Sequence, residues 1–159
     1  MLHLAAIVLA GAAAAPEPAL AAESPTFVAL SVRDLDASVE WYTRTLGLTA
    51  TRLPPHGISR AAILRGGGLL VELVQHGESF PLESRLPGLQ GRYLVQGIFK
   101  VGVFVDDLDA TVKRLEARGA RWKGRLYTDE TTAVRSILML DNEDNVIQLF
   151  EELKAPPKR

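Results

Sequence analysis

The stretch Ser31-Val-Arg-Asp-Leu-Asp-Ala-Ser-Val39 recurs 73 residues further along the chain as Phe104-Val-Asp-Asp-Leu-Asp-Ala-Thr-Val112. Six of the nine positions are identical, and Ser38 is matched by the chemically similar Thr111. A match of this density is improbable by chance, so the chain contains two copies of one structural module. Two copies are too few for a solenoid, and we expect a pseudo-symmetric pair.

Each copy predicts one strand, one helix and then three further strands. Strand-forming runs at 27–32 and 100–105 precede helices whose apolar residues recur at helical spacing. Asp36 and Asp109 are expected to cap these helices, because a short carboxylate can accept hydrogen bonds from free amide groups at a helix start. The later strands are expected at 50–53, 61–65, 69–75, 121–127, 133–140 and 145–151. The predicted fold class is therefore α+β, built from tandem βαβββ modules.

The composition is that of a globular domain without a strong net charge. The chain has 159 residues, of which 47% are apolar and 23% charged, and its formal net charge is -1. No basic excess exists to drive nucleic-acid binding. Cysteine is absent, which excludes disulfides, cysteine-ligated zinc, iron–sulfur clusters and thiol nucleophiles. The histidines are only His3, His56 and His76, so few side chains are available for metal chemistry.

Residues 1–22 differ from the rest of the chain and predict a secretory signal peptide. The run from Leu4 to Ala15 is apolar or small throughout, and Ala19-Leu20-Ala21 offers a cleavage signature. Cleavage there would release the protein to the periplasm or the exterior. The run is too short for a stable membrane span, which needs about 20 apolar residues. The alternative is a misassigned start codon, which would leave the protein in the cytoplasm.

The globular domain is expected at 26–152, followed by a polar tail at 153–159. Its first module covers 26–76 and its second covers 98–152. The connector between them, 77–97, is rich in proline and glycine and predicts no strand or long helix. A loop of this length within a compact domain is often functional, so the connector is a candidate lid.

Side chains alternate along a strand, and the predicted strands therefore have two unlike faces. One face is aliphatic, as in Val101 and Val103, and is expected to cover the helices. The other face is mixed, because Glu72, Lys100 and Gln148 stand on otherwise apolar strands. Burying these groups without partners would be costly. They therefore either satisfy one another or line a cavity suited to a small molecule.

The order of these motifs resembles the vicinal oxygen chelate superfamily, which includes glyoxalase I, extradiol dioxygenases, and fosfomycin- and bleomycin-resistance proteins. The similar stretches are 28–42, 46–48, 70–73, 100–109 and 141–151. Each motif is weak alone, but their order and duplication carry the resemblance. The resemblance implies that the paired modules form a curved, cup-shaped mixed sheet around a central cleft.

Metal-using members of this superfamily place ligands at four positions that correspond here to Phe27, Glu72, Lys100 and Gln148. Family enzymes have histidine or glutamate there, and only Glu72 is such a ligand. An aromatic ring cannot coordinate, an ammonium repels a cation, and an amide oxygen is a weak ligand. His56 and His76 are expected in loops away from the ligand positions. The sequence therefore predicts no metal and no other cofactor, with a divalent metal only as the alternative.

Three arrangements of the substituted site remain open. Lys100 and Glu72 could form an ion pair beside Gln148 in place of the metal. Lys100 could instead receive an anionic ligand, with Phe27, Phe104 and Phe150 as apolar or stacking walls. In the third arrangement Lys100 and Glu72 are catalytic, since a partly buried lysine can act as a base or a Schiff-base amine.

The leading hypothesis is a metal-independent protein that binds a small polar, aromatic or anionic molecule. One alternative is an enzyme of the lyase, isomerase or dioxygenase type, which uses Glu72 and Lys100 or a non-standard metal site. The other alternative is an interaction module whose own side chains fill the cleft. The expected partner is a small molecule, with no nucleic acid and no membrane, and family analogy adds a homodimer.

Overall fold

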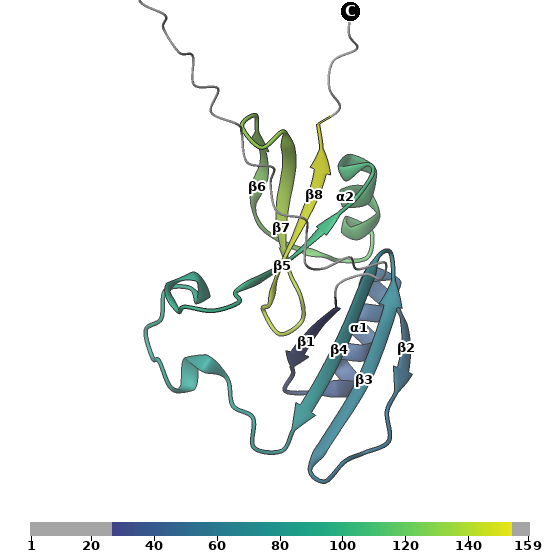
Figure 1. Ribbon diagram of the computed structural model, residues 1–159, viewed down its shortest axis with the longest axis vertical. Helices are drawn as coiled ribbons and strands as arrows, with labels where there is room; N and C mark the ends of the chain where they lie inside the picture. The colour runs from purple at the N-terminus through teal and green to yellow at the C-terminus, as the bar shows by residue number, and fades with distance from the viewer. Residues whose placement is uncertain (1–26, 154–159) are drawn as a thin grey trace, which may run out of the picture.

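The computed structural model describes residues 27–153, which form two modules of the same topology (Figure 1). Module 1 contains β1 (Phe27–Ser31), α1 (Leu35–Trp41), β2 (Thr49–Arg52), β3 (Ser59–Gly66) and β4 (Leu69–His76). Module 2 contains β5 (Lys100–Phe104), α2 (Leu108–Glu116), β6 (Arg121–Asp129), β7 (Val134–Leu140) and β8 (Val146–Glu152). The expected signal peptide, residues 1–22, and the tail from residue 154 onward lie outside the described residues.

The strands follow the same order in both sheets, β1-β4-β3-β2 and β5-β8-β7-β6. In each sheet the first strand runs parallel to the last, and the other neighbours are antiparallel. The prediction of an α+β fold with tandem βαβββ modules is therefore confirmed. The two sheets are separate, so β1 and β5 are each an edge strand with one unpaired side.

Both helices are capped by the first aspartate of the repeated Asp-Leu-Asp sequence. The Asp34 carboxylate accepts the amide groups of Asp36 and Ala37 at 2.9 and 3.1 Å. Asp107 accepts the amide of Ala110 at 2.8 Å in the same way. The prediction that Asp36 and Asp109 are the caps was wrong, because they lie inside the first turn and point outward.

Asp36 and Asp109 instead bind arginines from the neighbouring strands. Asp36 pairs with Arg52 and Arg60, and Asp109 pairs with Arg135 at 2.7 Å. Hydrogen bonds from Arg60 and Arg135 hold the pKa values of Asp36 and Asp109 below the usual carboxyl range. After Trp41, α1 continues as a π-helical turn (Tyr42–Leu46), which ends at Gly47 in the left-handed conformation that glycine permits.

The aliphatic faces of the strands pack on the helices, as the alternation predicted. Val71, Leu73, Ile147 and Leu149 belong to one buried core that also contains residues of both helices. The mixed faces are open, and Phe27 and Phe104 leave 54% and 63% of their surface exposed.

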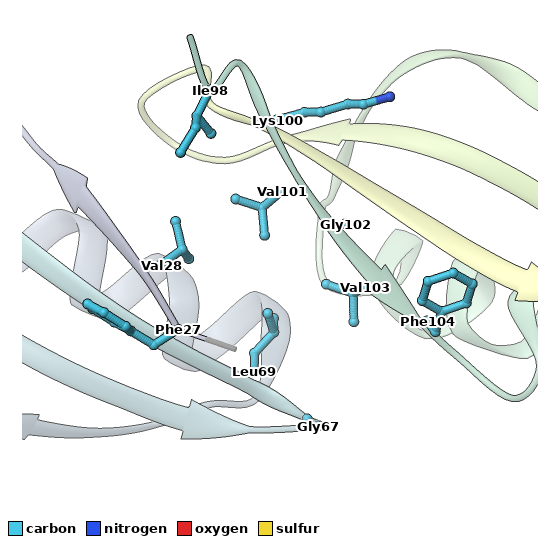
Figure 2. A pocket seen from close by; sticks show the side chains of 11 residues that line it. Phe27, Val28, Gly67, Leu69, Ile98, Lys100, Val101, Gly102, Val103 and Phe104 are labelled. Carbon is cyan, nitrogen blue, oxygen red and sulfur yellow. The ribbon is translucent and has the colours of Figure 1, made fainter. Parts of the chain in front are cut away.

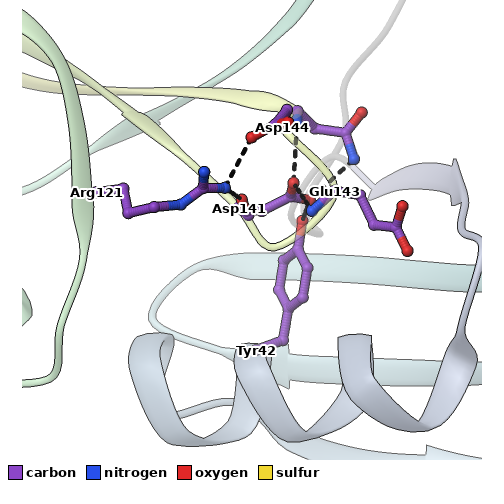
Figure 3. A network of polar contacts seen from close by, with 6 residues as sticks. Tyr42, Arg121, Asp141, Glu143 and Asp144 are labelled. Atoms are coloured by element: carbon purple, nitrogen blue, oxygen red, sulfur yellow. Dashed lines mark hydrogen bonds and ion pairs between the residues drawn. The ribbon is translucent and has the colours of Figure 1, made fainter.

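A loop of module 2, residues 141–145, holds the two modules together (Figure 3). It joins β7 to β8 and reaches the helical segment of module 1. The Tyr42 hydroxyl donates to Asp141 Oδ2 at 2.8 Å, and both residues are almost fully buried. The Asn142 amide donates to Ser38 Oγ at 2.9 Å. The Glu143 carboxylate accepts the backbone amide of Arg33 at 3.0 Å. These contacts set the orientation of β8 relative to module 1.

In the structure the connector extends to residue 99, two residues beyond the predicted 77–97, because β5 begins at Lys100. It runs outside both sheets and forms only two short 3-10 turns, Leu82–Ser84 and Arg92–Leu94. The Arg92 guanidinium donates to the side chain of Asn145 at 3.1 Å and so ties the connector to the 141–145 loop. Several of its large apolar side chains are exposed, namely Phe80, Leu86, Tyr93, Leu94, Ile98 and Phe99. Within residues 27–153, the helices are too short or too polar to cross a membrane.

Candidate functional site

Three polar side chains form a hydrogen-bonded row across β5, β8 and β7 on the open face of module 2. The Lys100 ammonium donates to Gln148 Oε1 at 2.5 Å. The amide nitrogen of Gln148 donates in turn to Ser136 Oγ at 3.0 Å. The buried Ser136 thereby orients Gln148 so that its carbonyl oxygen faces the ammonium. The row holds a cation at a defined place on an exposed sheet face.

The Lys100 ammonium retains hydrogen-bonding capacity in this position. An ammonium has three N–H donors, and Gln148 is its one hydrogen-bond acceptor among residues 27–153. The ammonium nitrogen also lies 5.4 Å from the centre of the Phe99 ring, within the range of a cation–π contact. No carboxylate in the described part of the chain pairs with it. Two donors therefore remain for water or for an anionic ligand.

Two aromatic rings stack next to this row. Phe104 and Phe150 are cross-strand neighbours, and their ring centres are 5.2 Å apart with 22° between the planes. Gly102 is paired with Gln148 and lies between Lys100 and Phe104 on the same face of β5. A Cβ atom at Gly102 would come within 3.0 Å of the Phe150 ring, so glycine allows that ring to lie against β5. The exposed Phe104 ring covers one side of the Phe150 ring and is itself open to solvent on its other side.

Phe27 and Glu72 belong to the other sheet. Glu72 is half-buried between Ala29 of β1 and Ile63 of β3, and it has no ion pair among the described residues. Figure 2 shows the Phe27 side chain directed away from Lys100 and Phe104. The Lys100–Glu72 ion pair is therefore not formed within the chain, and the Lys100 ammonium donates to Gln148 instead. Phe27, Lys100 and Phe104 line one groove between β1 and β5, and Glu72 is not part of its lining.

An apolar groove of about 570 Å³ lies between the edge strands β1 and β5 (Figure 2). Val28 and Leu69 of module 1 line it opposite Val101 and Val103 of module 2. The lining also contains Phe27, Lys100 and Phe104, which were predicted from the sequence as site residues. Val28, Leu69, Val101 and Val103 were not predicted as site residues, because they belong to the aliphatic faces assigned to the helices.

The residues present do not fit the divalent metal of metal-using relatives. Phe27, Glu72, Lys100 and Gln148 supply one carboxylate and one amide oxygen, and the amide oxygen already accepts from an ammonium. His76 ends β4, and its Nδ1 accepts the backbone amide of Glu78, while His56 lies in the exposed turn before β3. Across residues 27–153, no group of three or more histidine, aspartate or glutamate side chains is arranged to hold a metal ion.

Other charged and aromatic side chains near the sheets have structural partners or are exposed. Arg60 and Arg135 pair with acidic groups, Arg135 with Glu151 at 3.0 Å as well as with Asp109. Trp41 and Tyr42 are buried in the core. Tyr127 is exposed on the same sheet as Lys100.

Comparison with known proteins agrees with this fold. The model of the Glyoxalase/Bleomycin resistance protein/Dioxygenase superfamily matches residues 25–149. The crystal structure of TioX from Micromonospora sp. ML1 is 27% identical, covers 82% of this chain and 99% of its own, and has a TM-score of 0.60. Two further structures are similar in fold. A glyoxylase/bleomycin resistance protein/dioxygenase domain from Frankia sp. EAN1pec is 21% identical, with coverages of 85% and 96% and a TM-score of 0.64. A glyoxalase family protein from Enterococcus faecalis is 17% identical, with coverages of 81% and 98% and a TM-score of 0.64. Comparison with curated proteins gives no match.

Proposed function

The chain belongs to the Glyoxalase/Bleomycin resistance protein/Dioxygenase superfamily, and from this membership we propose that it binds a small polar, aromatic or anionic molecule without a metal ion. The observation that carries the proposal is the hydrogen bond from Lys100 to Gln148. It joins two of the positions at which metal-using relatives place ligands. A cation at this place repels a second cation and attracts an anion.

The openness of the site supports binding over a cleft filled by the protein's own side chains. Lys100 and Phe104 are both exposed, and two donors of the ammonium have no acceptor among the described residues. A reaction that requires Lys100 and Glu72 together has less support, because within the described chain Lys100 donates to Gln148 and Glu72 does not line the groove that Lys100 lines. Binding is therefore the function that best accounts for the arrangement.

Export and self-association complete the proposal. Export would follow from cleavage of residues 1–22, and cell fractionation with mass spectrometry of the mature N-terminus tests it. Homodimer formation is proposed by analogy with the family. Sedimentation equilibrium of the purified chain tests it, since a monomer at all concentrations would contradict it.

The test of metal-independent binding is a thermal-shift screen on protein dialysed against EDTA. The screen uses small organic acids, their neutral amides and apolar aromatic compounds. We expect stabilisation by at least one class, because any ligand that binds only the folded state raises the melting temperature. Lys100→Met should weaken binding of acids, and Lys123→Met, which removes an exposed lysine of β6, is the matched control. If no compound stabilises the protein until a metal ion is added, the proposal is wrong.

A further inference from the structure

The arrangement of charge and aromatic surface on module 2 defines the ligand more narrowly. We infer that the site recognises a planar aromatic monocarboxylate, with its carboxylate on the Lys100 ammonium and its ring against the exposed face of Phe104. This inference rests on the proposed function and names its ligand class. Three features of the described residues carry it: a free cation, an open aromatic face and an acidic group at the opposite end of the site.

The first feature is the cation with its unused donors. Gln148 and Ser136 hold the ammonium over the sheet, and its remaining N–H groups are accessible. Charge-assisted hydrogen bonds from an ammonium to a carboxylate are about twice as strong as neutral ones. A neutral amide in place of the carboxylate would lose this contribution.

The second feature is the stacked pair of rings. The Phe104 ring lies at the end of the edge strand β5 and is 63% exposed. An aromatic ligand would extend the existing stack, and aromatic pairs are favourable beyond the area that they bury. Gln148 and Phe150 are two residues apart on β8, which is about 7 Å along a strand. A carboxylate joined directly to a ring spans a gap of that size.

The third feature is Glu152, whose carboxylate lies at the end of the site away from Lys100. Gln148, Phe150 and Glu152 follow one another on the same face of β8, so the acid lies beyond the rings from Lys100. A shallow depression of about 490 Å³ is lined by Phe104, Phe150 and Glu152, and Lys100 lies outside it, beyond the rings. A ligand with one carboxylate fits with its charge at the Lys100 end. A second carboxylate at the far end of the ring would meet Glu152.

The experiment is a calorimetric titration of the full chain with four probes that differ in one property each. 2-Naphthoate is the reference, decahydro-2-naphthoate lacks aromaticity, 2-naphthamide lacks the charge, and 2,6-naphthalenedicarboxylate adds a second charge. We expect 2-naphthoate to bind about fivefold more tightly than the saturated acid and about tenfold more tightly than the amide, in line with the gains from stacking and from a charge-assisted bond. The dicarboxylate should bind more weakly than 2-naphthoate.

Matched variants assign each preference to its residue. Lys100→Met should remove the preference for the acid over the amide, and Phe104→Leu should remove the preference for the aromatic over the saturated acid. Glu152→Gln should bring the dicarboxylate to the affinity of 2-naphthoate. Lys123→Met and Phe80→Leu, which removes an exposed ring of the connector, are the controls and should leave all preferences unchanged. Shifts of the Gly102 amide resonance on titration of the wild-type chain locate the ligand independently of any variant.

The inference and the proposed function fail in different ways. If the saturated acid or the amide binds as tightly as 2-naphthoate, or if Lys100→Met keeps the preference for the acid, the inference is wrong. It is also wrong if 2-naphthoate does not bind while another compound in the thermal-shift screen does, and the proposed function then stands. If no compound of any class binds the metal-free chain, both are wrong.

Discussion

Removal of the Tyr42 hydroxyl is expected to loosen the contact between the modules. This hydroxyl is buried and donates to Asp141, whose two carboxylate oxygens also accept the backbone amides of Glu143 and Asn145 and the side-chain amide of Asn145. Tyr42→Phe removes one of four hydrogen bonds and leaves the buried carboxylate short of a donor. A hydrogen bond to a charged group contributes about 1.5–3 kcal/mol. We therefore expect the free energy of unfolding to fall by about 2 kcal/mol.

Urea denaturation of the wild type and the variant, followed by circular dichroism, measures this difference. Tyr127→Phe is the matched control, because that side chain is exposed and its hydroxyl has no hydrogen bond among the described residues. The control should change the free energy of unfolding by less than about 0.5 kcal/mol. A Tyr42→Phe variant as stable as this control would refute the conclusion that the 141–145 loop holds the modules together.

Three further predictions concern the same framework. Burial, followed by the charge of Asp141, raises the pKa of Tyr42 far above its ordinary value of 10.0, so the contribution of Tyr42 to stability is complete below pH 10 and is lost at higher pH. Absorbance at 295 nm should therefore show Tyr42 ionising only as the chain unfolds. A phenolate signal from Tyr42 in the folded protein would contradict this. Asp34→Ala should reduce the free energy of unfolding by about 1 kcal/mol, because it removes the helix cap. Asp36→Ala removes no cap and should reduce the free energy of unfolding by less. Equal reductions for the two variants in urea denaturation would argue against Asp34 as the cap. Arg135 lowers the pKa of Asp109, so this carboxylate contributes to stability above the pKa it has in the unfolded chain, and the contribution is lost as the pH falls through its pKa in the folded protein. Asp109→Asn should therefore lose less stability on acidification than the wild type. Parallel plots of the free energy of unfolding against pH for the two proteins would contradict the prediction.

The repeat allowed most of the fold to be predicted. The nine-residue duplication located both helices, and alternation of side chains placed the strands to within about two residues. The helix caps were misassigned because Asp-Leu-Asp offers two carboxylates, and sequence alone does not distinguish the one that folds back from the one that points outward. Asp36 and Asp109 instead bind arginines of β2, β3 and β7, which are separated from them in sequence.

The positions of the candidate site residues could be predicted within each module, but their positions relative to the other module could not. Alternation correctly placed Lys100, Phe104, Gln148 and Phe150 on one face, because register within a sheet follows from strand periodicity. The separation of Glu72 from Lys100 depends on how the modules pack. That packing involves contacts such as Tyr42 with Asp141, which are 99 residues apart and leave no periodic pattern in the sequence.

The most direct test of the account is a calorimetric titration of the EDTA-dialysed full chain with Zn²⁺, Ni²⁺, Mn²⁺ and Fe²⁺, the last under anaerobic conditions. We expect no binding of one ion per chain at micromolar concentrations, because Lys100 and Phe27 occupy positions that would have to supply ligands. Stoichiometric binding of any of these ions, lost in Glu72→Gln, would contradict the claim that this chain binds its ligand without a metal.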